Sequence, residues 1–425
     1  MPSFGSLLVS LVAASSLAAA APADAGPHLK NGAFSVPVVH NKHVRLNGPV
    51  SLARTYMKFD KTVPEDVAAA LKRREKKLRH KYQKNHKNHK NHKSHKRSTG
   101  SAISVPAEND IEYLTPVQIG TPPQTLNLQL DTGSSDLWVF SNETAADEVN
   151  GQALYEPGKS STAEYLSGLA WSLVYGDRSN SSGNVFRDVV TVGGLTVQKQ
   201  AVETAKKVSA QFTNDTLSSG LLGLAFNKIN KVKPVQQKTF FDNAKESLDA
   251  PLFTADLKYH ADGKYNFGYI DDQAHNGPIT YSPIDSTKGF WNWTSTGYAV
   301  GANDFTETPI PNIADTGSSL MLLPDEIVGA YYSAVDGARY DMFQGGFIFD
   351  CDTTLPDFTF GVGNAKITIP AKFIKYAPAT GNECYGGLQS SSMIGFNIFG
   401  DIALKAALVV FDNGNSRIGW AAKNL

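Results

Sequence analysis

Residues 131–135 read Asp-Thr-Gly-Ser-Ser, and the same five residues return unchanged at 315–319, 184 positions later. In front of the first copy, residues 126–130 alternate leucine with polar side chains, which is the period of a half-buried strand. An apolar run follows each copy, at 137–140 and at 320–323. The pattern therefore predicts that each aspartate ends a strand and stands in a tight, glycine-containing loop.

A second repeated feature follows each copy at a nearly equal distance. Gly223 lies 92 residues beyond the first aspartate, within Gly-Leu-Leu-Gly-Leu, and Gly400 lies 85 residues beyond the second, within Asn-Ile-Phe-Gly-Asp. Two matched pairs of motifs indicate a duplicated unit. The 36 Gly, 21 Pro, 22 Phe and 16 Tyr favour turns and strands, and residues 412–415 carry an Asn-Gly hairpin signal. We therefore predict an all-β fold of two lobes related by a pseudo-twofold axis, with a cleft between them.

The charge of the chain is divided unevenly, although its 40 Lys and Arg balance its 40 Asp and Glu. Residues 1–97, here called the leader, hold 19 basic and 5 acidic residues, which leaves 21 and 35 for residues 98–425, here called the body. The leader is thus at +14 and the body at −14. A body of that charge repels phosphates, so no nucleic-acid partner is expected. It keeps only two His and two Cys, which argues against a zinc site, and we expect neither a metal nor another cofactor.

The start of the leader has the pattern of a secretory signal. Residues 7–17 form an apolar run that small alanines follow, which predicts a signal peptide over residues 1–20. A buried helix is the alternative, and the run is too short to span a membrane. No later run reaches the roughly 18 apolar residues of a membrane span, and residues 421–425 carry no anchor signal. We therefore expect a secreted, extracellular protein with no membrane partner.

Residues 21–97 are predicted to form a basic propeptide that ends in a His/Lys-rich linker. Residues 85–96 consist of four Asn-His-Lys or Ser-His-Lys units, which bury too little apolar surface to order themselves. Metal binding by these spaced His is the alternative. Lys96 and Arg97 stand just before the acidic body, and this coincidence predicts a processing point, although dibasic pairs are common in any Lys-rich tract. We expect the N-terminal lobe at residues 98–273 and the C-terminal lobe at 274–425.

A duplicated aspartate has a chemical purpose if the twofold axis brings Asp131 and Asp315 face to face. Two carboxyl groups that lie so near each other cannot both ionise without a large cost in free energy, so they share a proton at acid pH. One can then act as general base on a water held between them, while the other donates a hydrogen bond to the scissile carbonyl oxygen. The glycines permit the tight turns and the hydroxyls can fix each carboxylate; these supporting residues are Thr132, Gly133, Ser134, Thr316, Gly317 and Ser318. Two Asx-turns decorating a duplicated fold are the alternative, but they do not explain why all five residues are kept twice.

These motifs resemble those of the pepsin-family aspartic endopeptidases, most closely the secreted fungal enzymes such as penicillopepsin, aspergillopepsin I and endothiapepsin. The resemblance covers nearly all of residues 105–425. It implies that Asp131 and Asp315 hydrolyse peptide bonds of polypeptide substrates, with hydrophobic residues preferred around the scissile bond and inhibition by pepstatin-type compounds. It further implies that the loop serines hydrogen-bond the outer carboxylate oxygens, that the loop threonines lock the two loops together, and that Gly317 and Ser319 bind the substrate backbone.

The resemblance also identifies a flap, a hairpin that closes over the substrate, at residues 171–177. Tyr175 would be the flap tyrosine, followed by Gly176, with Trp138 placed to hydrogen-bond its hydroxyl. Asp177 and Ser179 match positions of fungal relatives that accept Lys before the scissile bond. Taken without the resemblance, Tyr-Gly-Asp indicates only a turn with an aromatic residue.

The main apolar pocket is implied to lie beside the flap. Phe212 and Leu221 match residues that line it, although each taken singly could be an ordinary core residue. This chain also departs from the Lys-accepting relatives, because Arg178 stands where they often have Gly. Its charge could compete for Asp177.

Cys351 and Cys384 match the single disulfide of the family's C-terminal lobe. Independently, an even pair of Cys in an exported chain suggests a structural bridge. Candidate N-glycosylation sequons lie at Asn142, Asn180, Asn214 and Asn292.

The leader is implied to be the inhibitory propeptide of a zymogen. Its charge attracts it to the body at neutral pH, whereas acid protonates body carboxylates and charges the leader His, so the attraction falls. Residues 52–59 resemble the prosegment element whose Lys reaches the catalytic pair, which makes Lys58 the inhibitory candidate. Relatives usually follow that Lys with Tyr, whereas this chain has Phe59. A surface Lys on an amphipathic helix is the alternative.

Two hypotheses from other functional classes compete with the hypothesis of a monomeric protease. A catalytically silent pepsin-fold binding or inhibitor protein would typically lose one aspartate, the flap tyrosine or a motif glycine, and none is lost here. A metal-binding protein acting through the His tract would leave the duplicated loops unexplained. We therefore expect an active endopeptidase.

Overall fold

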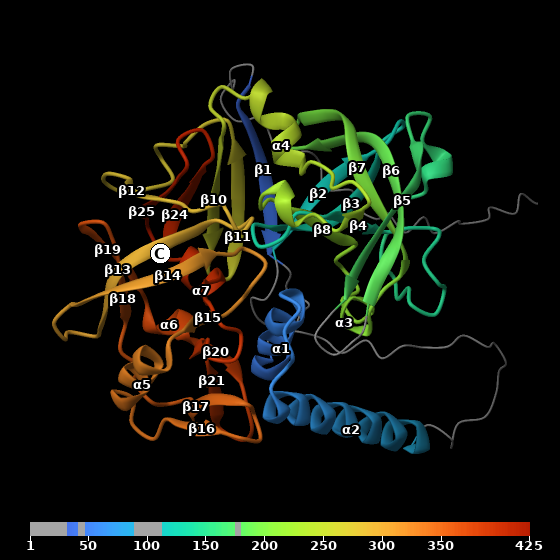
Figure 1. Cartoon of the computed structure of the whole chain (residues 1–425). Helices are drawn as coiled ribbons and strands as arrows, with labels where there is room; N and C mark the ends of the chain where they lie inside the picture. The colour runs from blue at the N-terminus through green and yellow to red at the C-terminus, as the bar shows by residue number, and fades with distance from the viewer. Residues whose placement is uncertain (1–31, 41–46, 89–112, 175–179) are drawn as a thin grey trace, which may run out of the picture.

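Two β-rich lobes lie side by side, the C-terminal lobe in orange and red and the N-terminal lobe mainly in green (Figure 1). The computed structural model describes residues 32–40, 47–88, 113–174 and 180–425. The signal peptide, Lys96, Arg97 and residues 175–179 lie outside the described residues. The predicted all-β, two-lobed fold is confirmed. The predicted domain boundaries stay a prediction.

Helices are short in the body and longer in the leader. In chain order they are α1 (Gly48–Lys58), α2 (Glu65–Asn88), α3 (Ala210–Thr213), α4 (Phe240–Ala244), α5 (Asp325–Ser333), α6 (Ala371–Ile374) and α7 (Asp401–Leu404).

One sheet runs through both lobes. In spatial order it contains β12 (Thr280–Pro283), β25 (Arg417–Ala422), β24 (Ala407–Asp412), β10 (Leu252–Lys258), β11 (Ala261–Phe267), β1 (Phe34–His40), β2 (Tyr113–Ile119), β3 (Gln124–Asp131), β8 (Gly220–Gly223), β4 (Leu137–Phe140), β7 (Leu195–Lys207), β6 (Asn180–Val192), β5 (Glu164–Val174) and β9 (Val232–Lys233). A strand of the leader, β1, therefore sits in the middle of the sheet that joins the lobes.

Two smaller sheets complete the C-terminal lobe. The larger contains β19 (Ala365–Ile369), β18 (Phe358–Val362), β13 (Asn292–Val300), β14 (Thr306–Ala314), β23 (Asn397–Phe399), β15 (Met321–Leu323) and β22 (Leu388–Ser390). The smaller contains β16 (Arg339–Asp341), β17 (Gly346–Asp350), β21 (Glu383–Gly386) and β20 (Lys375–Pro378).

The duplication seen in the sequence recurs as topology. In the N-terminal lobe β3 pairs in parallel with β8, and β8 pairs antiparallel with β4. In the C-terminal lobe β14 pairs in parallel with β23, and β23 pairs antiparallel with β15. In each lobe the strand that leads to an aspartate is thus held against the strand carrying the second repeated motif. The matched spacing of the two motifs follows from this shared hydrogen-bonding scheme.

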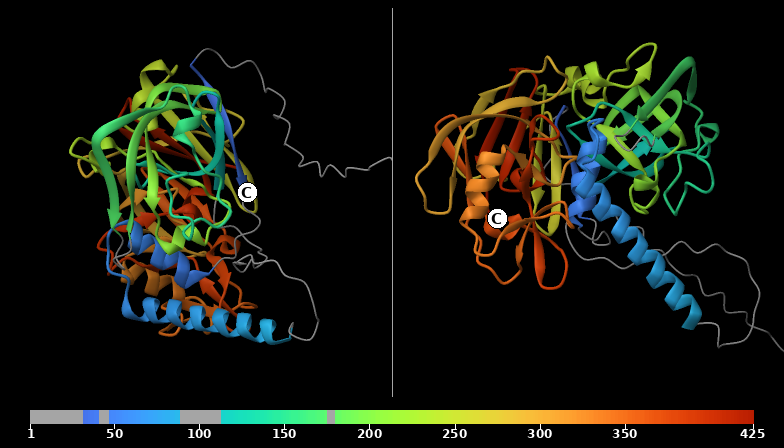
Figure 2. Two further views of the ribbon diagram at one scale, coloured as in Figure 1. Left: turned by 90° about the vertical axis from the view of Figure 1, so that its right-hand side faces the viewer. Right: turned by 60° about the horizontal axis from the view of Figure 1, so that its bottom comes forward.

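The described part of the leader is packed into the molecule at β1, at α1 and at the start of α2, whereas α2 is exposed from Lys72 to Lys77. Strand β1 pairs antiparallel with β11 over five positions and with β2 over two. Helix α1 enters between the lobes, and α2 runs on beneath them (Figure 2). Leu52, Tyr56 and Met57 of α1 belong to the same buried cluster as the cores of both lobes. The amphipathic helix expected around Lys58 is therefore buried on one face, and this burial places its polar side chains opposite the loops at 131 and 315.

Candidate active site

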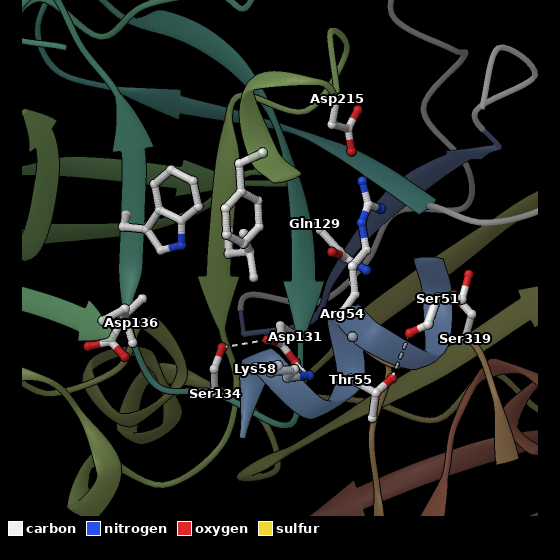
Figure 3. A pocket seen from close by; sticks show the side chains of 15 residues that line it. Ser51, Arg54, Thr55, Lys58, Gln129, Asp131, Ser134, Asp136, Asp215 and Ser319 are labelled. Carbon is white, nitrogen blue, oxygen red and sulfur yellow. Dashed lines mark hydrogen bonds and ion pairs between the residues drawn. The ribbon is translucent and has the colours of Figure 1, made fainter. Parts of the chain in front are cut away.

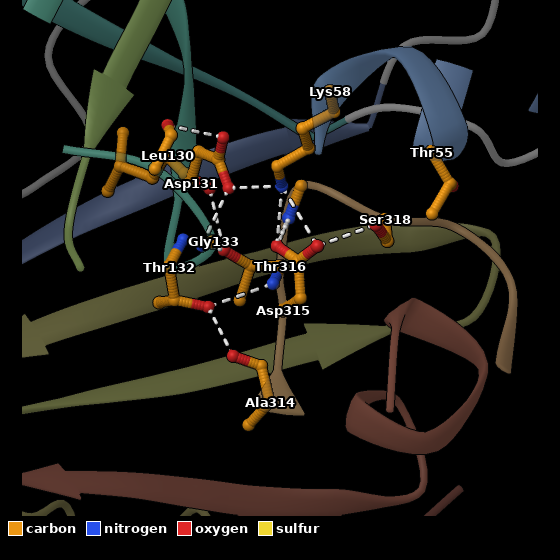
Figure 4. Close-up of polar contacts among 12 residues, drawn as sticks. Thr55, Lys58, Leu130, Asp131, Thr132, Gly133, Ala314, Asp315, Thr316 and Ser318 are labelled. Atoms are coloured by element: carbon orange, nitrogen blue, oxygen red, sulfur yellow. Dashed lines mark hydrogen bonds and ion pairs between the residues drawn. The ribbon is translucent and has the colours of Figure 1, made fainter. Parts of the chain in front are cut away.

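Two loops of the same design bring Asp131 and Asp315 together, and both carboxyl groups are fully buried. At each aspartate one oxygen accepts from the glycine two residues on: Gly133 N at 2.8 Å and Gly317 N at 2.9 Å. The other oxygen accepts from the serine three residues on, Ser134 Oγ at 2.6 Å and Ser318 Oγ at 2.5 Å. Each loop thus orients its own carboxylate through a backbone and a hydroxyl donor, as Figure 4 shows.

The two threonines tie the loops to each other across the lobe boundary. Thr132 N donates to Thr316 Oγ1 at 3.0 Å, and Thr316 N donates to Thr132 Oγ1 at 2.9 Å. Each hydroxyl then donates onward to the opposite strand, Thr132 Oγ1 to Ala314 O at 2.9 Å and Thr316 Oγ1 to Leu130 O at 2.7 Å. This reciprocal set fixes the separation of the two aspartates.

Glycine is required at both loop positions by the close approach of the opposite carboxyl group. A Cβ at residue 133 would lie 2.4 Å from Asp315 Oδ1, and one at residue 317 would lie 2.3 Å from Asp131 Oδ1. Both contacts are far below van der Waals distance. Any side chain at Gly133 or Gly317 would therefore push the carboxyl groups apart.

Lys58, at the end of α1, lies directly on the pair. Its Nζ donates to Asp131 Oδ1 at 2.6 Å and to the two oxygens of Asp315 at 2.7 and 2.9 Å (Figure 4). Its side chain is 14% exposed. The contact therefore contradicts the alternative of a surface Lys, and it covers the position from which a water could touch both carboxyl groups.

The electrostatics of the site follow from three ionisable groups enclosed together. Burial would raise the pKa of Asp131, but the Lys58 ammonium and the loop donors hold that pKa below its usual value. Burial raises the pKa of Asp315, and repulsion by Asp131 offsets the attraction of Lys58, so that pKa stays above its usual value. Burial would lower the pKa of Lys58, but the two carboxylates raise it. With Lys58 in contact, the pKa values of the two aspartates are therefore moved in opposite directions.

A cavity opens beside the pair (Figure 3). Its apolar wall is formed by Trp138, Leu173, Phe212 and Leu221, and the Trp138 and Phe212 rings meet edge to face at 4.9 Å. Ser319 and Gly317 line it as well. The structure therefore brings the expected pocket residues together beside Asp131. The flap residues Tyr175, Gly176, Asp177 and Ser179 lie outside the described residues.

Sequence reasoning missed part of the cavity lining, namely Ser51, Arg54, Thr55, Gln129, Asp136, Leu173 and Asp215. Figure 3 shows Arg54 extending from α1 toward Asp215. A signal for the α1 residues was present, because positions 51, 54, 55 and 58 follow the i, i+3, i+4, i+7 spacing of one helix face. No comparable sequence pattern indicates that Asp215 lines the cavity.

Phe59, which stands where relatives usually have Tyr, packs in an aromatic group on the other side of Lys58. Its ring lies 5.7 Å from that of Phe290 and 5.0 Å from that of Phe396, both edge to face. A tyrosine hydroxyl is not needed for this contact. Phe59 thus adds an apolar anchor to the polar contact of Lys58.

The remaining predicted residues lie away from the carboxyl pair. Cys351 and Cys384 form a disulfide. Asn142 and Asn214 are exposed, whereas Asn180 and Asn292 are partly buried, and the Asn292 amide donates to Asp285 O at 2.9 Å. Glycosylation stays a prediction at all four.

Comparison with known proteins assigns the family. The model of the family described as eukaryotic aspartyl protease matches residues 112–423. The chain belongs to this family. It is an aspartic-type endopeptidase of the pepsin type, and such proteases act on polypeptide substrates.

Several curated relatives are similar over almost their whole length. Endothiapepsin of Cryphonectria parasitica is 53% identical over 95% of this chain and 93% of its own. Podosporapepsin of Podospora anserina is 46% identical over 93% and 92%, and an aspergillopepsin-1 of Aspergillus oryzae is 44% identical over 98% and 99%. The similarity extends beyond the body, because the last alignment covers nearly all of the leader as well.

Neither a membrane-spanning helix nor a cluster of metal ligands is found in the described residues. No helix there is long and apolar enough to cross a membrane. In the same residues no three His, Cys, Asp or Glu side chains are grouped as metal ligands would be.

Proposed function

We propose that this protein is a secreted acid endopeptidase, made as a zymogen, that cleaves proteins between hydrophobic residues. The proposal rests on one observation above all, the two buried carboxyl groups that two loops of the same hydrogen-bonding design hold together. Secretion is supported by the apolar run at residues 7–17.

Catalysis requires the leader to leave, after which a water takes the place of Lys58 Nζ between the carboxyl groups. The ionised Asp131 accepts a proton from this water as its oxygen attacks the scissile carbonyl carbon. The protonated Asp315 donates to the carbonyl oxygen, and a tetrahedral gem-diol forms. Collapse returns one hydroxyl proton to Asp315, while the proton on Asp131 passes to the departing nitrogen and the C–N bond breaks.

Substrate preference is attributed to the cavity beside Asp131. Its wall of Trp138, Leu173, Phe212 and Leu221 offers apolar surface to a side chain next to the scissile bond. On the opposite side, Phe290 and Phe396 already hold an aromatic ring of the leader. Both contacts favour hydrophobic residues on the two sides of the cleaved bond.

Latency is attributed to the leader, which acts as an intramolecular inhibitor. Lys58 neutralises the carboxyl pair and excludes the water, while β1 and α1 hold it there. Acid protonates the carboxylates and weakens this ion pair. We propose that the leader is then released by cleavage near Lys96 and Arg97, leaving a monomeric enzyme.

The decisive experiment measures hydrolysis of denatured haemoglobin between pH 2 and 8 after acid pre-incubation, with and without pepstatin. We expect acid activity that pepstatin abolishes and that Asp131→Asn or Asp315→Asn lowers by about 10³-fold or more. Asp242→Asn, a change at a carboxylate paired with Lys245 far from the pair in sequence, is the matched control. A leader-free body without activity would favour the silent binding protein instead.

A further inference from the structure

A second pair of carboxyl groups is buried next to the Asp131 loop. One of them, Asp136, lines the cavity beside Asp131, and the proposed chemistry uses neither. Asp136 directly follows residues 131–135 and is 2% exposed. Glu203, on β7, is 1% exposed and faces Trp138 of β4 in the strand register. One amide nitrogen, Asn230 Nδ2, donates to both side chains, at 2.9 Å to Asp136 Oδ1 and at 3.0 Å to Glu203 Oε1. The two carboxyl groups are therefore held close together in a buried space, where two negative charges would repel each other.

The surrounding donors identify the protonated member. Asp136 Oδ1 accepts from Lys231 N at 2.7 Å and from Asn230 Nδ2 at 2.9 Å. Glu203 Oε1 accepts only from the same amide, at 3.0 Å, and its buried Oε2 has no donor among the described residues. Asp136 thus has the donors that an ionised carboxylate needs. Glu203 supplies its own hydrogen if it is the acid.

The orientation of Asn230 is fixed independently of the carboxyl groups. Its Oδ1 accepts from Val232 N at 3.2 Å and from Gln237 N at 2.8 Å. Reversing the amide would lose both bonds, so Nδ2 must face Asp136 and Glu203. The same Nδ2 also lies 3.2 Å from Ser135 O, inside the duplicated pentapeptide.

The pair stands at the base of the loop that carries Asp131. Main-chain bonds fix the outer side of the loop: Leu224 N donates to Asp131 O at 2.7 Å and Gly223 N to Asp136 O at 3.0 Å. The Asp136 carboxylate and Ser135 O are instead held by Asn230. A charge repulsion between Asp136 and Glu203 would therefore act on the residues next to Asp131.

The electrostatic surroundings favour retention of one proton. Burial raises the pKa of Asp136 to about 6, and burial followed by the Asp136 charge raises the pKa of Glu203 well above its usual value. The groups that face the pair are Lys231, whose charge favours the ionised Asp136, and Asp131, whose charge opposes it. No Lys or Arg in the described part of the chain forms an ion pair with either group. A second negative charge there would have no counter-ion.

We propose that Asp136 and Glu203 share one proton as a positioning pair, and that loss of this proton sets the upper pH limit at which the Asp131 loop keeps its working geometry. This rests on the proposed function and deepens it by adding a regulation of the same site. Because the folded state binds the proton more tightly than the opened state, stability falls as pH rises above the usual Glu range, until the folded pair ionises. Each pH unit in that window changes the ratio of folded to opened molecules by up to about tenfold per proton.

The test is Glu203→Gln, compared with Glu246→Gln at an exposed position. Glutamine keeps an oxygen for Asn230 and gives Asp136 a permanent amide donor, so the variant copies the protonated acid. After acid conversion, the pH at which half of each variant's own maximal activity is lost is measured between pH 4 and 9. We expect Glu203→Gln to shift that pH upward by roughly one unit and Glu246→Gln not to shift it.

A second variant and two non-catalytic measurements keep the test decisive. Asp136→Asn retains the oxygen for Lys231 N and donates to Glu203, so it should shift the limit in the same direction. Thermal unfolding against pH on the full chain must show the same shift, and this readout works even if no peptide is cleaved. Infrared spectra should show a protonated carboxylic acid at neutral pH that Glu203→Gln removes. The proposal would be overturned if both variants fold but lose activity at the same pH as Glu246→Gln. It would also be overturned if the wild-type spectrum lacked the carboxylic acid band.

Discussion

At the scale of single residues, the site depends on a few donors that have no substitute. Lys58 is the clearest case, because it is the cation that Asp131 and Asp315 contact in the structure described. Removing one partner of a buried, hydrogen-bonded charge group leaves the other charges uncompensated. The carboxyl pair would then repel itself, and the leader would lose its strongest polar contact.

We therefore expect Lys58→Ala to weaken latency. The full chain should convert at a higher pH than wild type and should show peptidase activity near neutral pH without acid pre-incubation. Lys61→Ala removes a nearby leader charge that forms no ion pair with either aspartate in the described part of the chain, and it should leave conversion unchanged. A Lys58→Ala protein that stays fully latent at neutral pH would exclude Lys58 as the inhibitory residue.

The threonine interlock yields a stability prediction. Thr316→Val removes the acceptor of Thr132 N, a donor on a residue that is 1% exposed. We expect the free energy of unfolding of the body to fall by about 1–3 kcal/mol in urea titrations. Thr359→Val, at an exposed hydroxyl pair with Thr368, serves as control and should change it by less than about 0.5 kcal/mol. Equal effects of the two changes would contradict a special role of the interlock.

At the scale of elements, local pattern accounts for the strands and for the loops at their ends. The alternation at 126–130 became β3, and the hairpin signal at 412–415 joins β24 to β25. Helix α1 also has local causes, since Asn47 caps it by accepting from Val50 N at 3.1 Å and a proline occupies its first turn. Which face of α1 is buried, in contrast, depends on how the helix packs against the rest of the molecule.

The disulfide offers a test at this scale. Cys351 follows β17 and Cys384 lies in β21, with 33 positions between them. In the chain-entropy model, closing a loop of this length stabilises the folded state by about 4 kcal/mol. The double variant Cys351→Ser/Cys384→Ser should therefore lose roughly 3–4 kcal/mol of unfolding free energy in denaturant titrations. Reduction of the disulfide in the wild type should give the same loss. An unchanged denaturation midpoint in the double variant and in the reduced wild type would refute this prediction.

At the scale of the whole molecule, the leader at +14 and the body at −14 form an acid-sensitive assembly. The direction in which leader docking changes with pH follows from Asp131, because the contact with Lys58 lowers the pKa of its carboxyl group. Its contribution to leader docking is complete above the usual Asp range and is lost as pH falls through the lowered pKa. The raised pKa of Lys58 keeps that cation charged throughout this window. Docking of the leader on the body should therefore weaken only as the pH falls.

We expect the pH of half-maximal conversion to rise with ionic strength. At 1 M salt the Debye length is about 3 Å, so the long-range attraction between leader and body is screened while the buried contacts of Lys58 persist. Conversion can be followed by electrophoresis at a series of pH values in about 0.05 and 1 M salt. The shift should be only a fraction of a pH unit, and a shift toward lower pH would contradict the role of net charge.

The sequence by itself determined the two-lobed β architecture, the two aspartates and the charge division. Motifs repeated at matched offsets, strand periodicity and composition are properties of the chain that need no coordinates. The sequence offered Lys58 as a candidate, but only the tertiary structure decided between that role and a surface Lys, because the contacted carboxyl groups lie 73 and 257 residues away. The pairing of Asp136 with Glu203 through Asn230 likewise depends on how β4, β7 and the segment before β9 pack. Local spacing specifies which face a residue occupies, whereas only packing decides what that face meets.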